Sequence, residues 1–555
     1  MDKARQQPTR DFAPVRTIES PPSTLFGIVR RLGPGLIVAG SIVGSGELIA
    51  TTKTGAEAGF CLLWLIVIGC VIKVFVQVEF GRYSIVNGRT TMDGLNTVPG
   101  PVFEVAATSD PASPRMRGNW LVWYWFLMWL ASIGQLGGIV GGVGQALAIS
   151  IPLTEAGRRY NVYVDLDTQL KVCRAELATQ GPVAEAAGSG DSTRAGLLAE
   201  IERIEKQIGN ENRSLIAELG AVRFEELGGK PPPGYDDRIW AGLIAIVTAV
   251  ILVVGRYGLI QSFSAALVCG FTFITIGNLW ALQSDDAWRV TWQDLARGFD
   301  IGKMLQSSDG LATALATFGI IGVGAAEIIA YPYWCLEKGY ARFTGPRDDS
   351  PEWADRAAGW MRVMRWDAGC SMLVYTFATM AFYLLGAAIL WRSGLNPAGS
   401  EMIRTLAVMY EPVFSDWAAG LFLFGAFAVL YSTYFVANAG HARVFADALG
   451  VLGAAAKDPA ANQRRVTFLS GLFPLLCLVI YVCFPAPAQL VLISGVMQAV
   501  MLPMLAVAGL YFRYYRNDSR IAPGKLWDVF LVVSAAGMFV AGVWTLIKWL
   551  APSMR

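Results

Sequence analysis

The sequence predicts an all-α protein that crosses a membrane many times and is built from two related halves. Of its 555 residues, 54% are hydrophobic, and the mean hydropathy is +0.45. A soluble chain could not bury that much apolar surface. The second observation is a similarity between residues 44–50 (GSGELIA) and 324–330 (GAAEIIA), each inside a long apolar segment. A carboxylate at matching places in two halves is typical of a transporter made of repeats.

We expect about eleven membrane-spanning helices, since that many apolar segments approach the ~20 residues that a bilayer core requires. They lie at roughly 33–55, 60–80, 119–151, 239–255, 259–282, 311–335, 367–391, 417–440, 466–484, 488–512 and 527–550. The first and the sixth segment contain the two similar sequences. The spans therefore divide into five, five and one.

Basic residues predict the orientation. Arg30, Arg31, Arg342 and Arg464 are among the many that share one side of the membrane if the N-terminus is cytoplasmic, whereas the short loops on the other side hold few. This bias follows the positive-inside rule. The polar N-terminus has no short apolar region with a cleavage site, so we expect no removable signal peptide. The prediction is a multi-pass protein of the plasma (inner) membrane with a cytoplasmic N-terminus.

These features divide the chain into six parts. They are a cytoplasmic tail (1–30), spans 1–3 of the first repeat (31–153), an extracytoplasmic insertion (154–237), spans 4–5 with a loop (238–310), the second repeat with spans 6–10 (311–512), and span 11 with the C-terminus (513–555). Within the insertion, Leu166, Leu170, Cys173 and Leu177 recur at helical spacing. A second such series follows a Gly/Ser/Ala-rich turn, which indicates an antiparallel helical hairpin.

The paired sequences point to a cation site. Interrupted helices free backbone carbonyls, and within a membrane such groups are tolerated only where they line a cavity. Glu47 and Glu327 would supply two negative charges. The carbonyl oxygens would come from near Val43, Gly44 and Ser45 at the first interruption and from near Val323, Gly324 and Ala325 at the second. Oxygen ligands favour Mg²⁺, Ca²⁺ or Mn²⁺ over softer metals.

Other interpretations of these residues remain open. Glu47 could be a buried strut paired with Lys53 or Lys73, and Glu327 could bond a backbone amide or a hydroxyl. A desolvated carboxylate could also carry protons. An organic-solute or amino-acid transporter and a non-transporting receptor or scaffold are the alternative functions. A net charge of +2 argues against a nucleic-acid partner, and a single His without HExxH or GxSxG motifs argues against an enzyme.

Several motifs resemble those of the NRAMP family of divalent-metal transporters. They are residues 33–35 (GPG), the interrupted stretch that ends at Glu47, residues 54–60 (TGAEAGF) with 62–64 (LLW), Gln77, and residues 88–89 (GR). Most of this support lies within residues 33–90, and the insertion lies outside the resemblance. The resemblance implies a LeuT-type fold with two inverted five-helix repeats. It also implies an ion-binding site between the first and sixth helices.

The chain departs from that family at its ligands. The family's Asp-Pro-Gly-Asn aligns with residues 44–47, and its Met-Pro-His tract aligns with residues 327–329. The acidic pair of the third helix aligns with Gln135 and Gly138. These departures are similar to a divergent, NRAMP-related branch of magnesium transporters. We therefore expect Mg²⁺ ahead of Mn²⁺ and weak or absent proton coupling. The expected partners are the transported ion and the lipid bilayer, with no cofactor, and the oligomeric state is not predicted.

Overall fold

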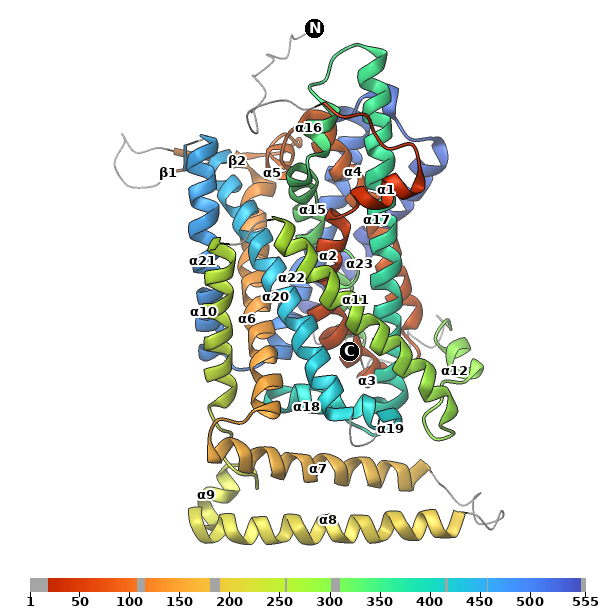
Figure 1. Ribbon diagram of the computed structural model, residues 1–555, viewed down its shortest axis with the longest axis vertical. Helices are drawn as coiled ribbons and strands as arrows, with labels where there is room; N and C mark the ends of the chain where they lie inside the picture. The colour runs from red at the N-terminus through yellow and green to blue at the C-terminus, as the bar shows by residue number, and fades with distance from the viewer. Residues whose placement is uncertain are drawn as a thin grey trace.

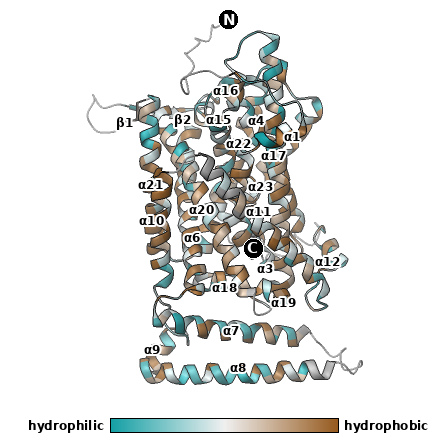
Figure 2. Ribbon diagram, viewed as in Figure 1, coloured by the Kyte–Doolittle hydropathy of each residue, from teal (hydrophilic) through white to brown (hydrophobic). Residues whose placement is uncertain are grey.

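The computed structural model is a bundle of long helices with two further helices laid across one end (Figure 1). It describes residues 18–106, 115–179, 190–254, 257–300, 310–414, 418–456 and 458–550. Apolar residues dominate the middle of the bundle, and hydrophilic residues are frequent on the two crossing helices (Figure 2). We call the end that carries these two helices the insertion end.

The described residues contain nine helices long and apolar enough to cross a membrane, or ten if one bent pair is a single span. The bent pair is α1 (Leu25–Arg31) with α2 (Pro34–Ile42), which meet at 56°. A further long helix, α11 (Tyr257–Ala281), occupies the predicted fifth position. These helices follow the eleven predicted segments in order.

The long helices are as follows. They are α4 (Leu63–Asn87), α6 (Trp120–Ser150), α10 (Asp236–Val254), α11, α14 (Leu311–Ile320) with α15 (Ala325–Lys338), α17 (Pro351–Leu385) with η4 (Gly386–Trp391), α20 (Ala418–Val451), α21 (Pro459–Cys483), α22 (Pro487–Tyr511) with η8 (Phe512–Arg516), and α23 (Lys525–Leu550). Shorter elements connect them: α5 (Thr91–Leu95), η3 (Leu282–Ser284), α12 (Trp292–Arg297), α16 (Tyr340–Thr344), η5 (Gly399–Glu401), α18 (Met402–Ala407), η6 (Val408–Tyr410), α19 (Glu411–Phe414) and η9 (Ser519–Ile521). A small antiparallel sheet of β1 (Val102–Ala106) and β2 (Arg115–Asn119) is an addition to the predicted all-α fold.

The first predicted interruption is a π-helix. The chain runs through α2, η1 (Val43–Thr51) and α3 (Thr52–Ala58), so the backbone of η1 widens and remains helical where we expected it to unwind. Gly44 permits a close approach to α20, because a Cβ atom there would lie 2.1 Å from Thr433 Oγ1. A π-helical bulge weakens the regular hydrogen-bond ladder and is frequent at functional sites.

The second interruption is a true break. Residues 321–324 are not helical, and Gly322 has a φ of 55°, in the left-handed region that favours glycine. A Cβ atom at Gly322 would also lie 2.8 Å from the Cα of Cys70 on α4. The break therefore needs glycine both for its backbone conformation and for its contact with the second span.

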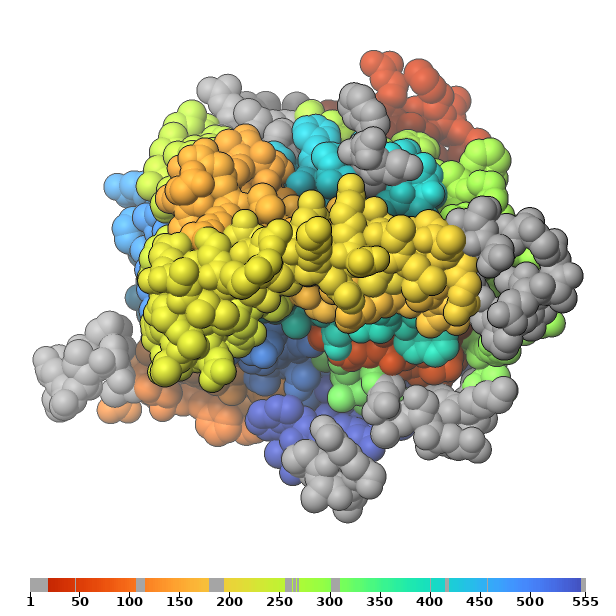
Figure 3. Space-filling view, turned by 90° about the horizontal axis from the view of Figure 1, so that it is seen from below, coloured from red at the N-terminus to blue at the C-terminus, as the bar shows by residue number. Residues whose placement is uncertain are grey.

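The insertion forms α7 (Glu155–Thr179), α8 (Gly190–Leu219) and α9 (Ala221–Glu226). Helices α7 and α8 pack side by side, with a small core of Tyr163, Val164, Leu215 and Phe224. Seen from the insertion end, α8 and α9 lie across the middle of that face (Figure 3). The chain leaves and re-enters the bundle at one place, since Thr154 Oγ1 donates a hydrogen bond of 2.7 Å to Asp236 Oδ1.

Candidate functional site

Glu47 lies in η1, and its side chain is fully buried. Its Oε1 atom accepts a hydrogen bond of 3.2 Å from the backbone N–H of Gly322 and one of 3.0 Å from Thr379 Oγ1 on α17. Its Oε2 atom is buried and has no hydrogen-bond partner among the described residues. Such an oxygen is costly to leave unpaired, so it is a candidate ligand for a cation.

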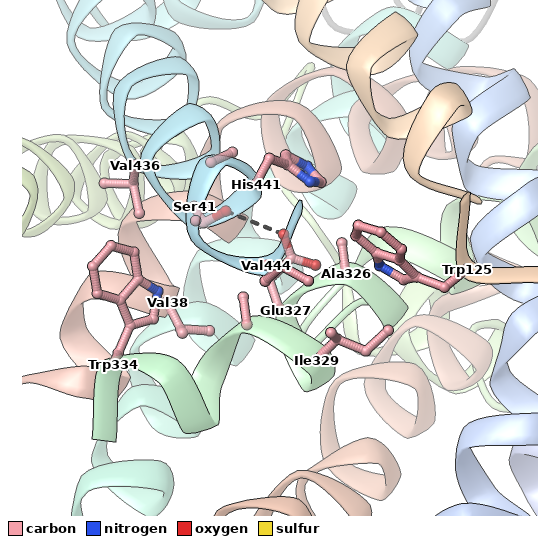
Figure 4. A pocket seen from close by; sticks show the side chains of 13 residues that line it. Val38, Ser41, Trp125, Ala326, Glu327, Ile329, Trp334, Val436, His441 and Val444 are labelled. Atoms are coloured by element: carbon pink, nitrogen blue, oxygen red, sulfur yellow. Dashed lines mark hydrogen bonds between the residues drawn. The ribbon is translucent and has the colours of Figure 1, made fainter. Parts of the chain in front are cut away.

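Glu327 lies in the first turn of α15 and is partly exposed to a pocket. Ser41 Oγ, on α2, donates a hydrogen bond of 3.1 Å to Glu327 Oε1 (Figure 4). Trp125 of α6, Trp334 of α15 and His441 of α20 also line this pocket. The helix N-terminus favours a negative charge in its first turn, which suits a carboxylate at this position.

Each of the two carboxylates therefore forms a hydrogen bond with a residue in the other half of the chain. Glu47 of the first half bonds to Gly322 in the break of the second half, and Glu327 of the second half bonds to Ser41 in the first helix. This reciprocal arrangement brings the two similar sequences into one region between α2–η1 and α14–α15, which also pack against each other through α2 with α15 and η1 with α14. The paired motif thus identified two segments that are neighbours in space.

The predicted backbone ligands have different surroundings. Val43 and Val323 are fully buried, Gly44 packs against α20, and Ser45 lies in η1 with its side chain outside the described set. A Cβ atom at Gly324 would lie 2.5 Å from Glu327 Oε2. A larger residue at Gly324 would therefore displace the Glu327 carboxylate.

Some carbonyl oxygens near the first interruption already have partners. Thr51 Oγ1 donates to the carbonyl of Gly46 at 2.8 Å, and Thr433 Oγ1 donates to that of Gly40 at 3.1 Å. One hydroxyl group thus compensates a carbonyl of η1 and the other a carbonyl of α2 just before it, as expected for helix bulges in a membrane. Neither carbonyl belongs to the predicted ligands Val43, Gly44 and Ser45.

Lys73 on α4 is a third charged residue of this region. Its side chain is fully buried, and its Nζ atom donates hydrogen bonds to the carbonyls of Phe318, at 2.7 Å, and Ile321, at 2.5 Å. It also interacts electrostatically with both Glu47 and Glu327. The sequence suggested Lys73 only as a possible partner of Glu47. Its role at the end of α14 depends on the fold.

Asp367 on α17 was not singled out in the sequence. It is buried, and its carboxylate accepts hydrogen bonds from the backbone N–H groups of Gly33, at 2.8 Å, and Gly35, at 2.5 Å, and from Tyr331 Oη at 3.0 Å. It therefore caps the N-terminus of α2 from another helix. A single Asp in an apolar span was the signal that could have identified it.

A group of amides connects the break to two other helices. Gln498 Oε1 on α22 accepts a hydrogen bond of 3.1 Å from the N–H of Ala326, and its Nε2 atom donates one of 2.9 Å to Gln135 Oε1 on α6. Ser494 Oγ donates to the same Gln135 oxygen at 2.8 Å. These residues hold the first turn of α15 in place through a backbone N–H that has no partner within the helix.

The region between η1 and the break offers a metal ion few charged side chains. Among the described residues, no group of three or more His, Cys, Asp or Glu side chains is placed to hold a metal ion. The pocket beside Glu327 is not lined by Glu47, so an ion in that pocket would meet one carboxylate supplemented by backbone or hydroxyl oxygens. Such oxygen-only sites suit hard cations.

The interrupted first and sixth helices, joined by reciprocal contacts between two halves, define a LeuT-type membrane transporter. The family model described as natural resistance-associated macrophage protein-like (Nramp) matches residues 215–548. The chain belongs to the Nramp family, whose members are transporters of divalent metal ions and not enzymes. The matched range does not include the motifs at residues 33–90, so the two lines of similarity are independent.

Solved structures agree with this fold. A histidine-to-alanine mutant of the manganese transporter of Eremococcus coleocola matches with a TM-score of 0.56 and 13% identity, covering 96% of this chain and 91% of that chain. The same transporter in complex with an aromatic bis-isothiourea substituted compound matches with a TM-score of 0.54 and 13% identity, over 96% of this chain and 91% of that chain. A comparison with curated proteins finds no match. At this identity the likeness concerns the fold.

Proposed function

We propose that this protein moves a hard divalent cation across the membrane and binds it between η1 and the break that separates α14 from α15. Glu47 and Glu327 are the charged ligands, and oxygens near Gly44 and Gly324 complete the site. The observation that carries this proposal is the buried and unpartnered Oε2 atom of Glu47, in a segment that contacts the α14–α15 break. Membership of the Nramp family supports a divalent metal ion as the substrate.

The donor chemistry supports Mg²⁺ ahead of Mn²⁺. Both carboxylates present oxygen, and the pocket beside Glu327 has the imidazole of His441 but no thioether or thiolate among its lining residues. Mg²⁺ keeps several of its water molecules and needs few protein carboxylates, which suits a site with two. Proton coupling is weak or absent in this proposal, in keeping with the departures from the family pattern at residues 327–329.

The pocket beside Glu327 suggests the direction of ion release. It continues from Glu327 along α15 to Trp334, away from the insertion end (Figures 1 and 4). If the N-terminus is cytoplasmic in the plasma membrane, as the basic residues predict, this pocket is on the cytoplasmic side. An ion held at Glu327 would then leave past His441 and Trp334.

Proteoliposome uptake tests the proposal. We expect E47Q and E327Q each to lower Mg²⁺ and Mn²⁺ uptake at least tenfold and the double variant to abolish it, because a neutral amide loses the attraction to a divalent ion. E337Q is the matched control, since Glu337 lies on the same helix α15 but forms a half-exposed ion pair with Arg443. A pH-sensitive dye inside the vesicles measures proton coupling, and an amino-acid arm tests the organic-solute alternative.

A structural role for Glu47 is the competing interpretation, because its Oε1 atom already satisfies Gly322 and Thr379. Calorimetry on purified protein separates the two. A ligand role predicts that E47Q stays folded and loses Mg²⁺ binding. Unchanged Mg²⁺ binding and uptake in E47Q and E327Q would falsify the site.

A further inference from the structure

The break in the sixth span separates two groups that a continuous helix would join. In an α-helix the N–H of Gly322 would donate to the carbonyl of Phe318, four residues earlier. Here Gly322 N–H donates to Glu47 Oε1 instead, and the carbonyl of Phe318 accepts from Lys73 Nζ. The Glu47 carboxylate thus accepts from the unpaired donor, and the Lys73 ammonium donates to the unpaired acceptor, of this one missing hydrogen bond.

Lys73 is held firmly at this end of α14. Its ammonium contacts the carbonyls of Phe318 and Ile321 and lies 5.0 Å from the centre of the Phe318 ring. Carbonyls at a helix C-terminus carry partial negative charge and lack intrahelical partners, so they attract a cation. Converging carbonyl oxygens and a nearby carboxylate, that of Glu47, are also the ligands that a small alkali cation would use.

We propose that the Lys73 ammonium, which is covalently part of the chain, occupies a cation-binding site at the C-terminal end of α14. The transporter therefore needs no dissolved monovalent cation at this site. Removal of the side chain makes the site available to Na⁺ or K⁺. This alkali-cation site lies in the same region as the proposed divalent site. Only its uptake experiment rests on the proposed transport function, and its stability experiment does not.

The first experiment measures thermal stability of purified protein in NaCl, KCl or choline chloride, and needs no transport. We expect the melting temperature of the unmodified protein to be the same in all three salts. Lys73→Ala should melt several degrees lower in choline chloride and should be restored saturably by Na⁺ or K⁺, because ligand binding to the folded state stabilises it. Lys73→Met should melt lower in every salt, since its side chain keeps the space filled without a charge.

Lys53→Ala is the matched control. Lys53 is also a buried lysine, but it bonds Asn396, the carbonyl of Pro397 and Glu57, away from the break. We expect its stability not to depend on alkali cations. If Lys73→Ala cannot be purified, Lys73→Ser, whose short side chain also leaves the space open, replaces it with the same expected restoration.

Two results overturn the inference: alkali-cation dependence of the unmodified protein, or a Lys73→Ala (or Lys73→Ser) protein that responds to no alkali cation. Uptake adds a second readout, in which Lys73→Ala should carry Mg²⁺ at least fivefold faster in NaCl than in choline chloride. Failure of the proposed divalent site would be recognised separately. In that case E47Q and E327Q would keep their uptake while the salt-dependent melting of Lys73→Ala persisted.

Discussion

Glu47 and Lys73 bear opposite charges and cap the two ends of the same interrupted hydrogen bond, at Gly322 N–H and at the carbonyl of Phe318. Each charge is buried, and each interacts electrostatically with the other. Removing one partner of a buried pair leaves the other uncompensated, which is more damaging than the pair is favourable. The break in α14–α15 is thus held open by the first and second spans, and its geometry depends on residues outside the sixth span.

Ser41 should position Glu327 for the ion. Ser41→Ala removes the 3.1 Å hydrogen bond to Glu327 Oε1. We expect KM for the divalent ion to rise about five- to tenfold, from about 1 kcal/mol of lost orientation, with little change in melting temperature. Uptake kinetics measure this. Ser84→Ala is the control, because Ser84 Oγ on α4 is buried without a partner among the described residues and should be replaceable; equal KM values for the two variants would contradict the role of Ser41.

Asp367 should be important for stability. Asp367→Asn weakens two charge-assisted hydrogen bonds to the N-terminus of α2 and should destabilise the protein by about 2–3 kcal/mol. Tyr331→Phe removes the hydroxyl bond to the same carboxylate and a longer one, of 3.4 Å, to the carbonyl of Met364, and should cost about 1 kcal/mol. Thermal unfolding of the two variants measures the difference. A Tyr331→Phe protein less stable than Asp367→Asn would contradict the capping role.

Glu411 should make stability depend on pH at the insertion end. Burial, and next the nearby charge of Glu176 on α7, raise the pKa of Glu411 to about 7. A folded-state pKa above the unfolded value stabilises the protein at low pH, and this contribution disappears as the pH rises from about 4 through about 7. Glu411→Gln should therefore be more stable than the unmodified protein at pH 8, by about 1–3 kcal/mol, and similar to it at about pH 4.

Melting temperatures of both proteins across this pH range provide the measurement. The Glu411 variant should show a flatter profile between about pH 4 and pH 8. Glu337→Gln, whose carboxylate is paired with Arg443, serves as the control and should follow the unmodified profile. A stability gain that grows toward low pH would have the wrong sign and would refute the assignment.

The insertion should be dispensable for transport. Its two ends meet where Thr154 bonds Asp236, so residues 155–235 can be replaced by a short Gly/Ser linker without stretching the bundle. We expect uptake of the deleted protein to stay within about twofold of normal, because the insertion lies across the end of the bundle and none of its described residues contributes a ligand to the proposed site. Loss of uptake in a well-folded deletion protein would mean that α7 and α8 take part in transport. The ion pairs of Arg404 with Asp165 and of Lys230 with Glu401 would be the first contacts to examine.

The position of the long helices was predictable because each is a local property of an apolar segment of sufficient length. The similarity between residues 44–50 and 324–330 also indicated which two spans are interrupted. It did not indicate the form of each interruption. The first is a π-helix in which Thr51 bonds the carbonyl of Gly46, while Thr433 bonds that of Gly40 just before it, and only the second is a break with Gly322 at its centre.

The functions of Lys73, Thr379 and Asp367 could not be predicted, since each acts on a segment about 250 to 330 positions away in the chain. Such contacts depend on helix packing, and nothing local in the sequence specifies which distant backbone group a buried charge will reach.

By itself, the sequence determined the class of molecule. It showed many apolar segments long enough to cross a membrane, and two similar segments, one in each half, that each contain a glutamate. Those properties follow from the cost of exposing polar backbone and charge to lipid, which acts on every segment separately. Only the tertiary structure decided that Glu47 and Glu327 each bond to the opposite half, and that an ammonium from α4 occupies the end of α14. The physical reason is that a buried charge takes the partners that packing brings within reach, and packing is a property of the whole chain.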